Sequence, residues 1–360
     1  MAEVTRTERV KSKARALGFD VVGIARADLP LAEDHARYAR FLADGMHGEM
    51  AWLARDAAAR ERLDGPEILS GARSVVCLAR RYDRPAAEQA DPPFARKLAR
   101  YARGRDYHGA LRKRLRQLAA FLRGLGDGVE ARPMVDDVPV LERAWAARAG
   151  LGFVGKNGML IVPGQGSYVL LGEVVTTLGL DPDDAIPGRC GACRLCLDAC
   201  PTGAFPRPFV LDARRCVAYL TIELRGPIDP ALREGVGDRL FGCDVCQEVC
   251  PFNQAKRADA DATWLAPHAR WKEARPEHAL DPAGGTFEAW AAGSPLHRAT
   301  ASGLARNAAV LLGNTGDRAA LPVLSGARAG HPDPVVREAA AWAIARIEAQ
   351  TTQPPPRVRT

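Results

Sequence analysis

The stretch "CGACRLCLDACP", from Cys190 to Pro201, decides the fold class of this chain. Its cysteines follow the spacing C-x2-C-x2-C-x3-C-P, in which three thiolates wrap one iron–sulfur cubane and the fourth reaches a second cluster. Eight of the nine cysteines lie between Cys190 and Cys250, although the chain has 360 residues. The spacing therefore predicts a two-cluster unit of the bacterial ferredoxin type.

A second run, "CDVCQEVCP" from Cys243 to Pro251, repeats the C-x2-C-x3-C-P ending, but Leu240 occupies the place of its first cysteine. Cys216 is the only spare thiol nearby. If the last cysteine of each run crosses over, two complete [4Fe-4S] ligand sets result. The first set is Cys190, Cys193, Cys196 and Cys250, and the second is Cys200, Cys216, Cys243 and Cys246.

Structural zinc is the alternative for paired C-x2-C elements. A zinc site needs four ligands and gives no reason for a third cysteine in the x2 series, and the prolines after Cys200 and Cys250 belong to the ferredoxin pattern. The sequence favours iron–sulfur clusters. Cys77, in the strand-like "SVVCLA", is interpreted as a small buried apolar residue.

The composition is that of a globular protein, with 47% apolar and 26% charged residues. The N-terminal "MAEVTRTERVKSKARALGFD" has no apolar run of a secretion signal, and no window approaches the roughly 18 apolar residues of a membrane span. We therefore expect a cytoplasmic protein without a membrane partner. The net charge of +7 is compatible with a polyanionic partner but does not establish one.

Periodicity predicts an α+β multidomain chain. Residues 1–185 read as an α/β domain, with a helix over 8–18, strands at "DVVGIA" and "ARSVVCLA", long helices at 107–126 and 139–150, and further strands of the same sheet at "GMLIVP" and "SYVLLGEVVTTL". Residues 186–256 form the ferredoxin-like domain. The remaining boundaries are a helical domain over 257–349 and a disordered tail over 350–360.

The helical domain contains two similar alanine-rich segments. "LARNAAVLL" is echoed by "VVREAAAWA", which places Arg306 and Arg337 31 residues apart. This pattern is typical of short HEAT-like repeats. Its functional interpretation is an arginine-edged concave surface for a macromolecule, and the alternative is a structural cap.

Two other motifs fail their structural context. "GLGFVG" (150–155) matches a dinucleotide loop, but a helix precedes it and a strand follows, which is the reverse of the required order. "DYH" (106–108) begins like a cobalamin-binding signature with a lower histidine ligand, but Leu111 replaces its glycine. We therefore expect that His108 does not ligate cobalt.

The chain resembles the epoxyqueuosine reductases, the cobalamin-dependent iron–sulfur enzymes of tRNA queuosine synthesis. The resemblance spans about residues 100–345 and includes "YARGRDYHGALRKRL", "MVDDVPVLERAWAARAGLGFVGKNGMLIVPGQGSYVLLGE", "RRCVAYLTIE" and "FGCDVCQEVCPFN". The order and spacing of all eight clustered cysteines agree with that family. Together with these blocks, the cysteine pattern is specific to this family, whereas the cysteine pattern alone would match many ferredoxin-like proteins.

The resemblance implies a bound cobalamin without a protein histidine on cobalt, two [4Fe-4S] clusters, and reduction of the epoxide of epoxyqueuosine at the tRNA wobble position. The proton donor of the family falls on Asp136. A carboxyl group fills that role only when it is protonated near neutral pH, which requires burial or a neighbouring negative charge. Asp137 departs from the serine or threonine usual in the family.

The resemblance also implies cobalamin contacts. Leu160, Leu171 and Asn157 match contact positions, Ala218 stands where serine is usual and keeps only a backbone contact, and Asp244 is expected near both a cluster and the cofactor. An arginine on the corrin side is Arg60 or Arg62, and Arg60 is favoured.

The implied partners are tRNA carrying epoxyqueuosine and an unidentified low-potential electron donor. Residues 96–116 contain nine Lys or Arg and one acid, which suits a phosphate backbone. A solvated helix face is the alternative interpretation of this charge. We expect a monomer. Two other functions remain open: a reductive dehalogenase-like enzyme acting on a small molecule, and a non-catalytic electron-transfer protein.

Overall fold

The structure is a computed structural model that describes residues 4–84, 90–136, 138–254 and 264–352. The strands in the described residues are β1 (Val21–Arg26), β2 (Ser74–Arg81), β3 (Ala131–Met134), β4 (Phe153–Val154), β5 (Leu160–Ile161) and β6 (Val169–Thr176). Four of them form a sheet in the order β1-β2-β6-β3, and every pairing in it is antiparallel. The N-terminal part is therefore an α+β arrangement rather than the alternating α/β type that the sequence predicted.

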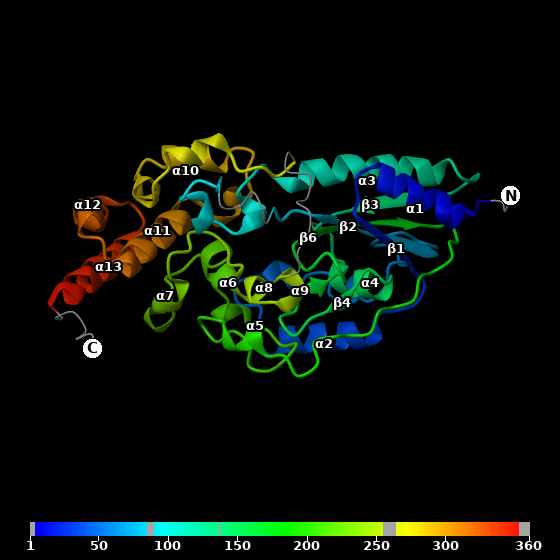
Figure 1. The fold of residues 1–360 in the computed structure, drawn as a ribbon, viewed down its shortest axis with the longest axis horizontal. Helices are drawn as coiled ribbons and strands as arrows, with labels where there is room; N and C mark the ends of the chain where they lie inside the picture. The colour runs from blue at the N-terminus through cyan, green and yellow to red at the C-terminus, as the bar shows by residue number, and fades with distance from the viewer. Residues whose placement is uncertain (1–3, 85–89, 137, 255–263, 353–360) are drawn as a thin grey trace.

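Helices cover both faces of this sheet (Figure 1). One face packs against α1 (Arg6–Ala16) and α3 (Tyr107–Arg123), and the other against α4 (Glu142–Arg148). Leucines at helical spacing along α3, from Leu111 to Leu122, are fully buried against the sheet. α2 (Ala32–Ala43) lies at the edge of the molecule below the sheet (Figure 1).

The β4–β5 hairpin forms a separate two-stranded sheet. The prediction that "GMLIVP" belongs to the main sheet is wrong, because Leu160 and Ile161 pair only with β4. Gly150 follows α4 with φ +73°, and a Cβ on Gly152 would lie 2.1 Å from the backbone oxygen of Ile161. The glycines of "GLGFVG" therefore serve the helix end and the hairpin, with the helix–strand order expected from the sequence.

The cluster region is built from short helices at the centre of the molecule, between the sheet and the C-terminal helices (Figure 1). These helices are α5 (Leu195–Asp198), α6 (Val217–Ile222), α7 (Pro230–Val236), α8 (Val245–Glu248) and α9 (Pro251–Gln254). α5 and α8 contact each other. α5 contains Cys196 and α8 contains Cys246, so their contact brings the two cysteine runs together.

The C-terminal part contains α10 (Gly285–Ala291), α11 (Ala301–Thr315), α12 (Leu321–Gly330) and α13 (Pro334–Thr352). α11 and α13 carry the two similar alanine-rich segments and pack on each other. They share one hydrophobic core with α6 and α7, which includes Leu220, Val236 and Leu304. α13 continues beyond the expected boundary at 349, and the rest of the predicted tail, from residue 353, lies outside the described residues.

Arg306 does not lie at the edge of a binding surface. It is 1% exposed, and its guanidinium donates to the carbonyl oxygens of Leu220, Leu224 and Gly226 at 2.6 to 2.8 Å. This geometry contradicts the arginine-edge interpretation at that position and matches the structural alternative. α11 therefore supports the loop that follows α6.

Candidate functional site

Asp136 lies where the end of β3 meets the start of α3. β3 pairs with β6 up to Met134, and Asp136 then adopts φ +54°, a left-handed conformation that aspartate tolerates. Its Oδ2 accepts a hydrogen bond from the Tyr107 hydroxyl at 2.7 Å and lies 3.2 Å from His108 Nε2. The first turn of α3 therefore faces the expected proton donor.

Asp106 orients His108. It caps α3 by accepting the His108 backbone N–H at 2.9 Å, and its Oδ1 also lies 2.6 Å from His108 Nδ1. Both ring nitrogens of His108 are therefore engaged by carboxylates. These hydrogen bonds, first to Asp106 and then to Asp136, raise the pKa of His108 to about 9, so the ring is protonated at neutral pH.

The electrostatics of Asp136 differ from the expectation. The hydrogen bond from His108 lowers the pKa of Asp136, and that from Tyr107 adds to the effect, against a smaller contribution from burial. The Asp136 side chain is 53% exposed, so it lacks the apolar enclosure that would keep a carboxyl group neutral. In this state the proton resides on His108 rather than on Asp136. Asp137 lies outside the described residues.

Tyr107 and His108 are functional candidates that the sequence reasoning did not select. The signal was present in "DYH", since an aspartate before a helical pattern predicts an N-cap. That motif was considered only as a cobalt-binding signature. In the structure both ring nitrogens of His108 have carboxylate partners.

The clustered cysteines fall into two neighbouring groups. Burial raises the pKa of Cys196, and the thiols of Cys190, Cys250 and Cys193 add to this shift. In the second group, burial raises the pKa of Cys246, followed by the effects of Cys216 and Cys243.

Cys200 acts on Cys216 in the same way, so it joins the second group. Within the described ranges, no three His, Cys, Asp or Glu side chains converge to hold a single metal ion. A cubane presents four separate iron corners, so its thiolates need not converge in that way.

The loop between β4 and β5 joins the sheet region to both cysteine groups. Lys156 Nζ donates to the carbonyl oxygens of Gly191 and Cys193 at 2.6 and 2.8 Å. Asn157 Nδ2 donates to the Cys246 carbonyl oxygen at 3.2 Å, and its Oδ1 accepts from Met159 N–H. The "GKN" motif therefore fixes the cysteine loops through backbone contacts.

The other expected cofactor residues occupy different environments. Asp244 is 7% exposed, and its Oδ2 accepts from the Arg100 backbone N–H at 2.8 Å. Leu160 is buried in β5, whereas Leu171 and Ala218 stay partly exposed. Asn157 and Asp244 thus have structural hydrogen bonds in addition to any contact with a cofactor.

The two candidate arginines, Arg60 and Arg62, differ in burial and in their partners. Arg60 is 6% exposed, lies over the Tyr38 ring at 5.5 Å, and leaves its Nε without a hydrogen-bond partner. Arg62 forms an exposed ion pair with Asp64 at 2.8 Å. An unsatisfied buried donor suits a residue that awaits a ligand, which fits the preference for Arg60.

These residues fit a cobalamin. The partly exposed Leu171 and Ala218 offer apolar surface, and Arg60 offers an unsatisfied donor. Met134 pairs with Glu173 at the end of β3, and Leu171 lies two residues before Glu173 on β6. The expected corrin contact and the expected proton donor therefore both lie close to the end of the β3–β6 ladder.

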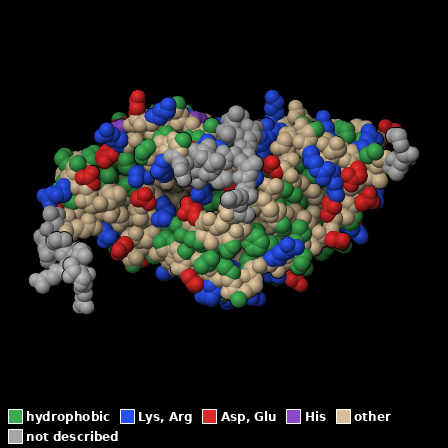
Figure 2. All heavy atoms as spheres, viewed as in Figure 1, with side chains coloured by type: hydrophobic (Ala, Val, Ile, Leu, Met, Phe, Trp, Pro, Cys, Tyr) green, Lys and Arg blue, Asp and Glu red, His purple; other side chains and the backbone are tan. Residues whose placement is uncertain are grey.

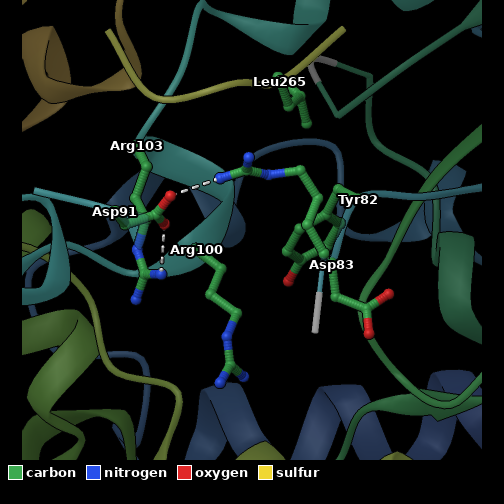
Figure 3. Close-up of a pocket in the computed structure, with 7 residues that line it drawn as sticks. Tyr82, Asp83, Asp91, Arg100, Arg103 and Leu265 are labelled. Atoms are coloured by element: carbon green, nitrogen blue, oxygen red, sulfur yellow. Dashed lines mark hydrogen bonds and ion pairs between the residues drawn. The ribbon is translucent and has the colours of Figure 1, made fainter. Parts of the chain in front are cut away.

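A charged hollow of about 230 Å³ lies between the end of β2 and the segment that carries Arg100 and Arg103 (Figure 3). Figure 3 shows Asp91 between two arginines: it accepts from Arg84 at 2.8 Å and from Arg103 at 3.1 Å. Arg100, which also lines the hollow, stacks on Tyr168 at 4.4 Å and donates its backbone N–H to Asp244. The network holds the segment that supports Asp244.

A second hollow, of about 540 Å³ and open to solvent, lies between α3 and β3 beside Asp136. Its lining combines arginines and apolar side chains: Arg112, Leu115, Arg116, Arg132, Pro133, Met134, Val135 and Val138. Lys113 and Arg116 are exposed on α3. Figure 2 shows further Lys and Arg side chains scattered over this end of the molecule.

Part of the basic run over residues 96–116 has internal partners. Arg103 is buried against Asp91, Arg105 Nε donates to the Trp264 carbonyl oxygen at 2.8 Å, and Arg114 Nε donates to the Leu17 carbonyl oxygen at 3.0 Å. The expectation of one continuous basic surface is therefore too broad. The exposed basic residues of the run are Arg96 and Arg105, before α3, and Lys113 and Arg116 on α3.

The fold and site define an iron–sulfur oxidoreductase with a mixed helix–sheet catalytic region and a ferredoxin-like unit. A family model described as a 4Fe-4S double cluster binding domain matches residues 189–253, and one described as epoxyqueuosine reductase QueG, DUF1730, matches residues 62–137. The epoxyqueuosine reductase of Gloeobacter violaceus is 45% identical over 313 residues, which cover 86% of this chain and 96% of that protein. The chain belongs to the epoxyqueuosine reductase family.

Solved structures agree with this assignment. An epoxyqueuosine reductase with an epoxyqueuosine-modified tRNA-Tyr stem loop has a TM-score of 0.82 at 31% identity, covering 97% of this chain and 94% of that one. The Bacillus subtilis enzyme, in a structure with its aspartate catalytic loop swung out of the active site, has a TM-score of 0.82 at 31% identity, covering 94% and 90%. No helix among the described residues is long and apolar enough to cross a membrane.

Proposed function

We propose that this epoxyqueuosine reductase uses cobalamin and two [4Fe-4S] clusters to reduce the epoxide of epoxyqueuosine at the tRNA wobble position. The reaction consumes two electrons and two protons, breaks both C–O bonds of the epoxide, forms a carbon–carbon double bond and releases water. The observation that carries this proposal is the Tyr107–Asp136–His108 constellation, which lies just beyond the end of the β3–β6 ladder.

Two sets of cysteines would hold the clusters. The first is Cys190, Cys193, Cys196 and Cys250, and the second is Cys200, Cys216, Cys243 and Cys246. The neighbouring thiols around Cys196 and Cys246 support this division. Arg60, Asn157, Leu160, Leu171, Ala218 and Asp244 would line the cobalamin. When bound, these groups supply low-potential electrons and a strongly reducing cobalt centre.

Asp136 would deliver a proton to the oxygen that leaves the opened epoxide. A general acid is required there because an alkoxide is a poor product at neutral pH. The protonated His108 lies 3.2 Å from Asp136 Oδ2 and would resupply that proton. Tyr107, which donates to the same oxygen, orients the carboxyl group.

The substrate partner would be the anticodon stem loop of tRNA. The solved relative with a modified tRNA stem loop supports this choice. The hollow beside Asp136, with Arg112, Arg116 and Arg132 on its rim, suits a nucleotide next to the wobble base. Arginine side chains and apolar surface together favour phosphate contacts and an unstacked base.

The segment that carries Asp136 would also have an outward state. The swung-out catalytic loop of the Bacillus subtilis structure supports this part of the proposal. The described conformation of Asp136, in contact with Tyr107 and His108, is then the inward and active state.

The proposed organisation is a cobalamin-binding domain over residues 1–185, a ferredoxin-like domain over 186–256 and a HEAT-like helical domain over 257–349. The enzyme would act as a cytoplasmic monomer and would take its electrons from a separate low-potential donor. The packing of α11 on α6 supports a helical domain that braces the cluster region.

The direct test is conversion of epoxyqueuosine in tRNA. Anaerobically reconstituted protein with cobalamin and a low-potential reductant is expected to yield queuosine, read by mass spectrometry of the nucleosides. Protein that demonstrably holds cobalamin and both clusters, yet leaves epoxyqueuosine unchanged, would contradict the proposal.

A further inference from the structure

A second carboxylate lies behind Asp136. Glu142, the first residue of α4, accepts the Asp136 backbone N–H on its Oε1 at 2.8 Å. The hydrogen bond reaches the residue that has left the strand conformation of β3 with φ +54°. Because this contact is to the backbone, it fixes the course of the chain without engaging the Asp136 carboxyl group.

Glu173 lies inside the sheet, next to Glu142. It lies on β6 between Cys77 of β2 and Met134 of β3, in the register of the central strands. Side chains alternate along a strand, so Glu173 shares the α4 face with Val175, while Val174 packs on the α3 face. A glutamate is thus placed within an otherwise apolar layer.

Glu173 has no other visible role. Its side chain is 0% exposed, and its carboxyl group interacts with the Glu142 carboxyl group. Burial first, and the nearby Glu142 second, raise the pKa of Glu173 well above its usual range, so it retains its proton.

Glu142 is more exposed to solvent than Glu173. It is only partly buried. Burial and the charge of Asp136 raise the pKa of Glu142 to about 7. A neutral Glu173 next to Glu142 avoids placing two charges in the same apolar layer.

We propose that Glu142, supported by the buried Glu173 of β6, is a positioning residue that latches the Asp136 segment in its inward state. The latch acts through the Asp136 backbone N–H and leaves the carboxyl group of Asp136 free for Tyr107 and His108. Its importance for turnover rests on the proposed role of Asp136.

Amide hydrogen exchange of the full-length, cofactor-loaded protein tests the latch directly. Glu142→Ala removes the acceptor, so exchange in a peptide covering residues 135–141 is expected to accelerate about tenfold, while peptides from β2 and α3 remain unchanged. In Glu142→Gln the amide oxygen still accepts the Asp136 N–H, so exchange stays near the wild-type rate. Glu173→Gln, which keeps a neutral side chain of the same shape, also preserves slow exchange.

Glu8→Ala is the matched control. Glu8 is likewise an acidic residue in the first turn of a helix, but it lies in α1, so its loss leaves exchange of residues 135–141 unchanged. The latch is overturned if Glu142→Ala leaves that exchange unchanged, or if Glu142→Gln exchanges as fast as Glu142→Ala. A general loss of protection across α4 and β6 in Glu142→Ala would also overturn it, because Glu142 would then support the fold as a whole.

Turnover provides the second measurement. Glu142→Ala is expected to lower kcat about tenfold with little change in KM, and Glu142→Gln to restore most of it. Amide exchange is measured without substrate, so it tests the latch independently of the proposed function. If the protein shows the expected exchange pattern but does not convert epoxyqueuosine, the latch is supported and the proposed function is contradicted. A normal kcat in Glu142→Ala, with accelerated exchange, would overturn the positioning role.

Discussion

At the scale of single residues, the site depends on how three side chains share protons. Asp136 was predictable from the "VDD" block of the sequence, but its partners were not. Tyr107 and His108 lie in a helix, 29 and 28 residues before Asp136, and only tertiary contact brings them to it. The acid role was expected to need a protonated Asp136, whereas the hydrogen bond from His108 lowers the pKa of that carboxyl group.

This pairing predicts a pH dependence. The folded pKa of His108 is about 9, above the unfolded value of about 6.5, so its stabilising contribution is complete below about pH 6.5 and disappears as pH rises through about 9. We expect single-turnover rates to fall over the same upper range, because His108 can then no longer resupply the proton.

The measurement is the rate as a function of pH for the wild type and for His108→Gln. The variant is expected to be slower and to lose the inflection near pH 9. Substrate binding, measured separately at each pH, controls for effects on tRNA affinity. An unchanged inflection in the variant would assign it to another group.

At the scale of secondary-structure elements, the long helices and the longer strands of the main sheet were predictable. β3 escaped prediction because it spans only Ala131–Met134 and contains Pro133, which lowers strand propensity. The β4–β5 hairpin was assigned to the wrong sheet, because hydrophobic periodicity does not reveal which strand is the partner. The order of elements around "GLGFVG", with a helix before it and a strand after it, was predicted correctly.

The contact between α4 and β1 yields a stability prediction. A Cβ on Gly23 would lie 2.0 Å from the Ala149 carbonyl oxygen, so Gly23→Ala is expected to lower the free energy of unfolding by roughly 1–3 kcal/mol. Gly326, inside α12, has open space around it, and Gly326→Ala should raise that free energy by about 0.5–1 kcal/mol. Anaerobic denaturant titration compares the two, and equal effects would contradict the close approach of α4.

At the scale of the whole molecule, the cysteine pattern was sufficient to place a ferredoxin-like unit in the middle of the chain. Sequence could not show which arginines are buried. Arg306 binds carbonyl groups inside the helical core, and Arg103 binds Asp91. Both looked like surface charges, because charge runs carry no information about burial.

The exposed part of the basic segment leads to a binding prediction. Replacing Lys113 and Arg116 of α3 by Gln is expected to weaken binding of the tRNA stem loop and to make the slope of log affinity against log salt shallower by about one per lost phosphate contact. Arg328→Gln, on the exposed face of α12 at the opposite end of the molecule, is the control (Figure 1). Fluorescence anisotropy over a salt series measures both. Equal slopes in all variants would place the tRNA elsewhere.

The central claim is that Asp136 delivers the proton during epoxide reduction. The most direct measurement is a single-turnover assay of Asp136→Asn beside the wild type, with cobalamin and iron content matched and reduction of both cofactors followed by absorbance. The account predicts that the variant reduces its cofactors normally but forms queuosine at least about 100-fold more slowly, because the amide cannot supply the proton. Queuosine formation by the variant at the wild-type rate would contradict it.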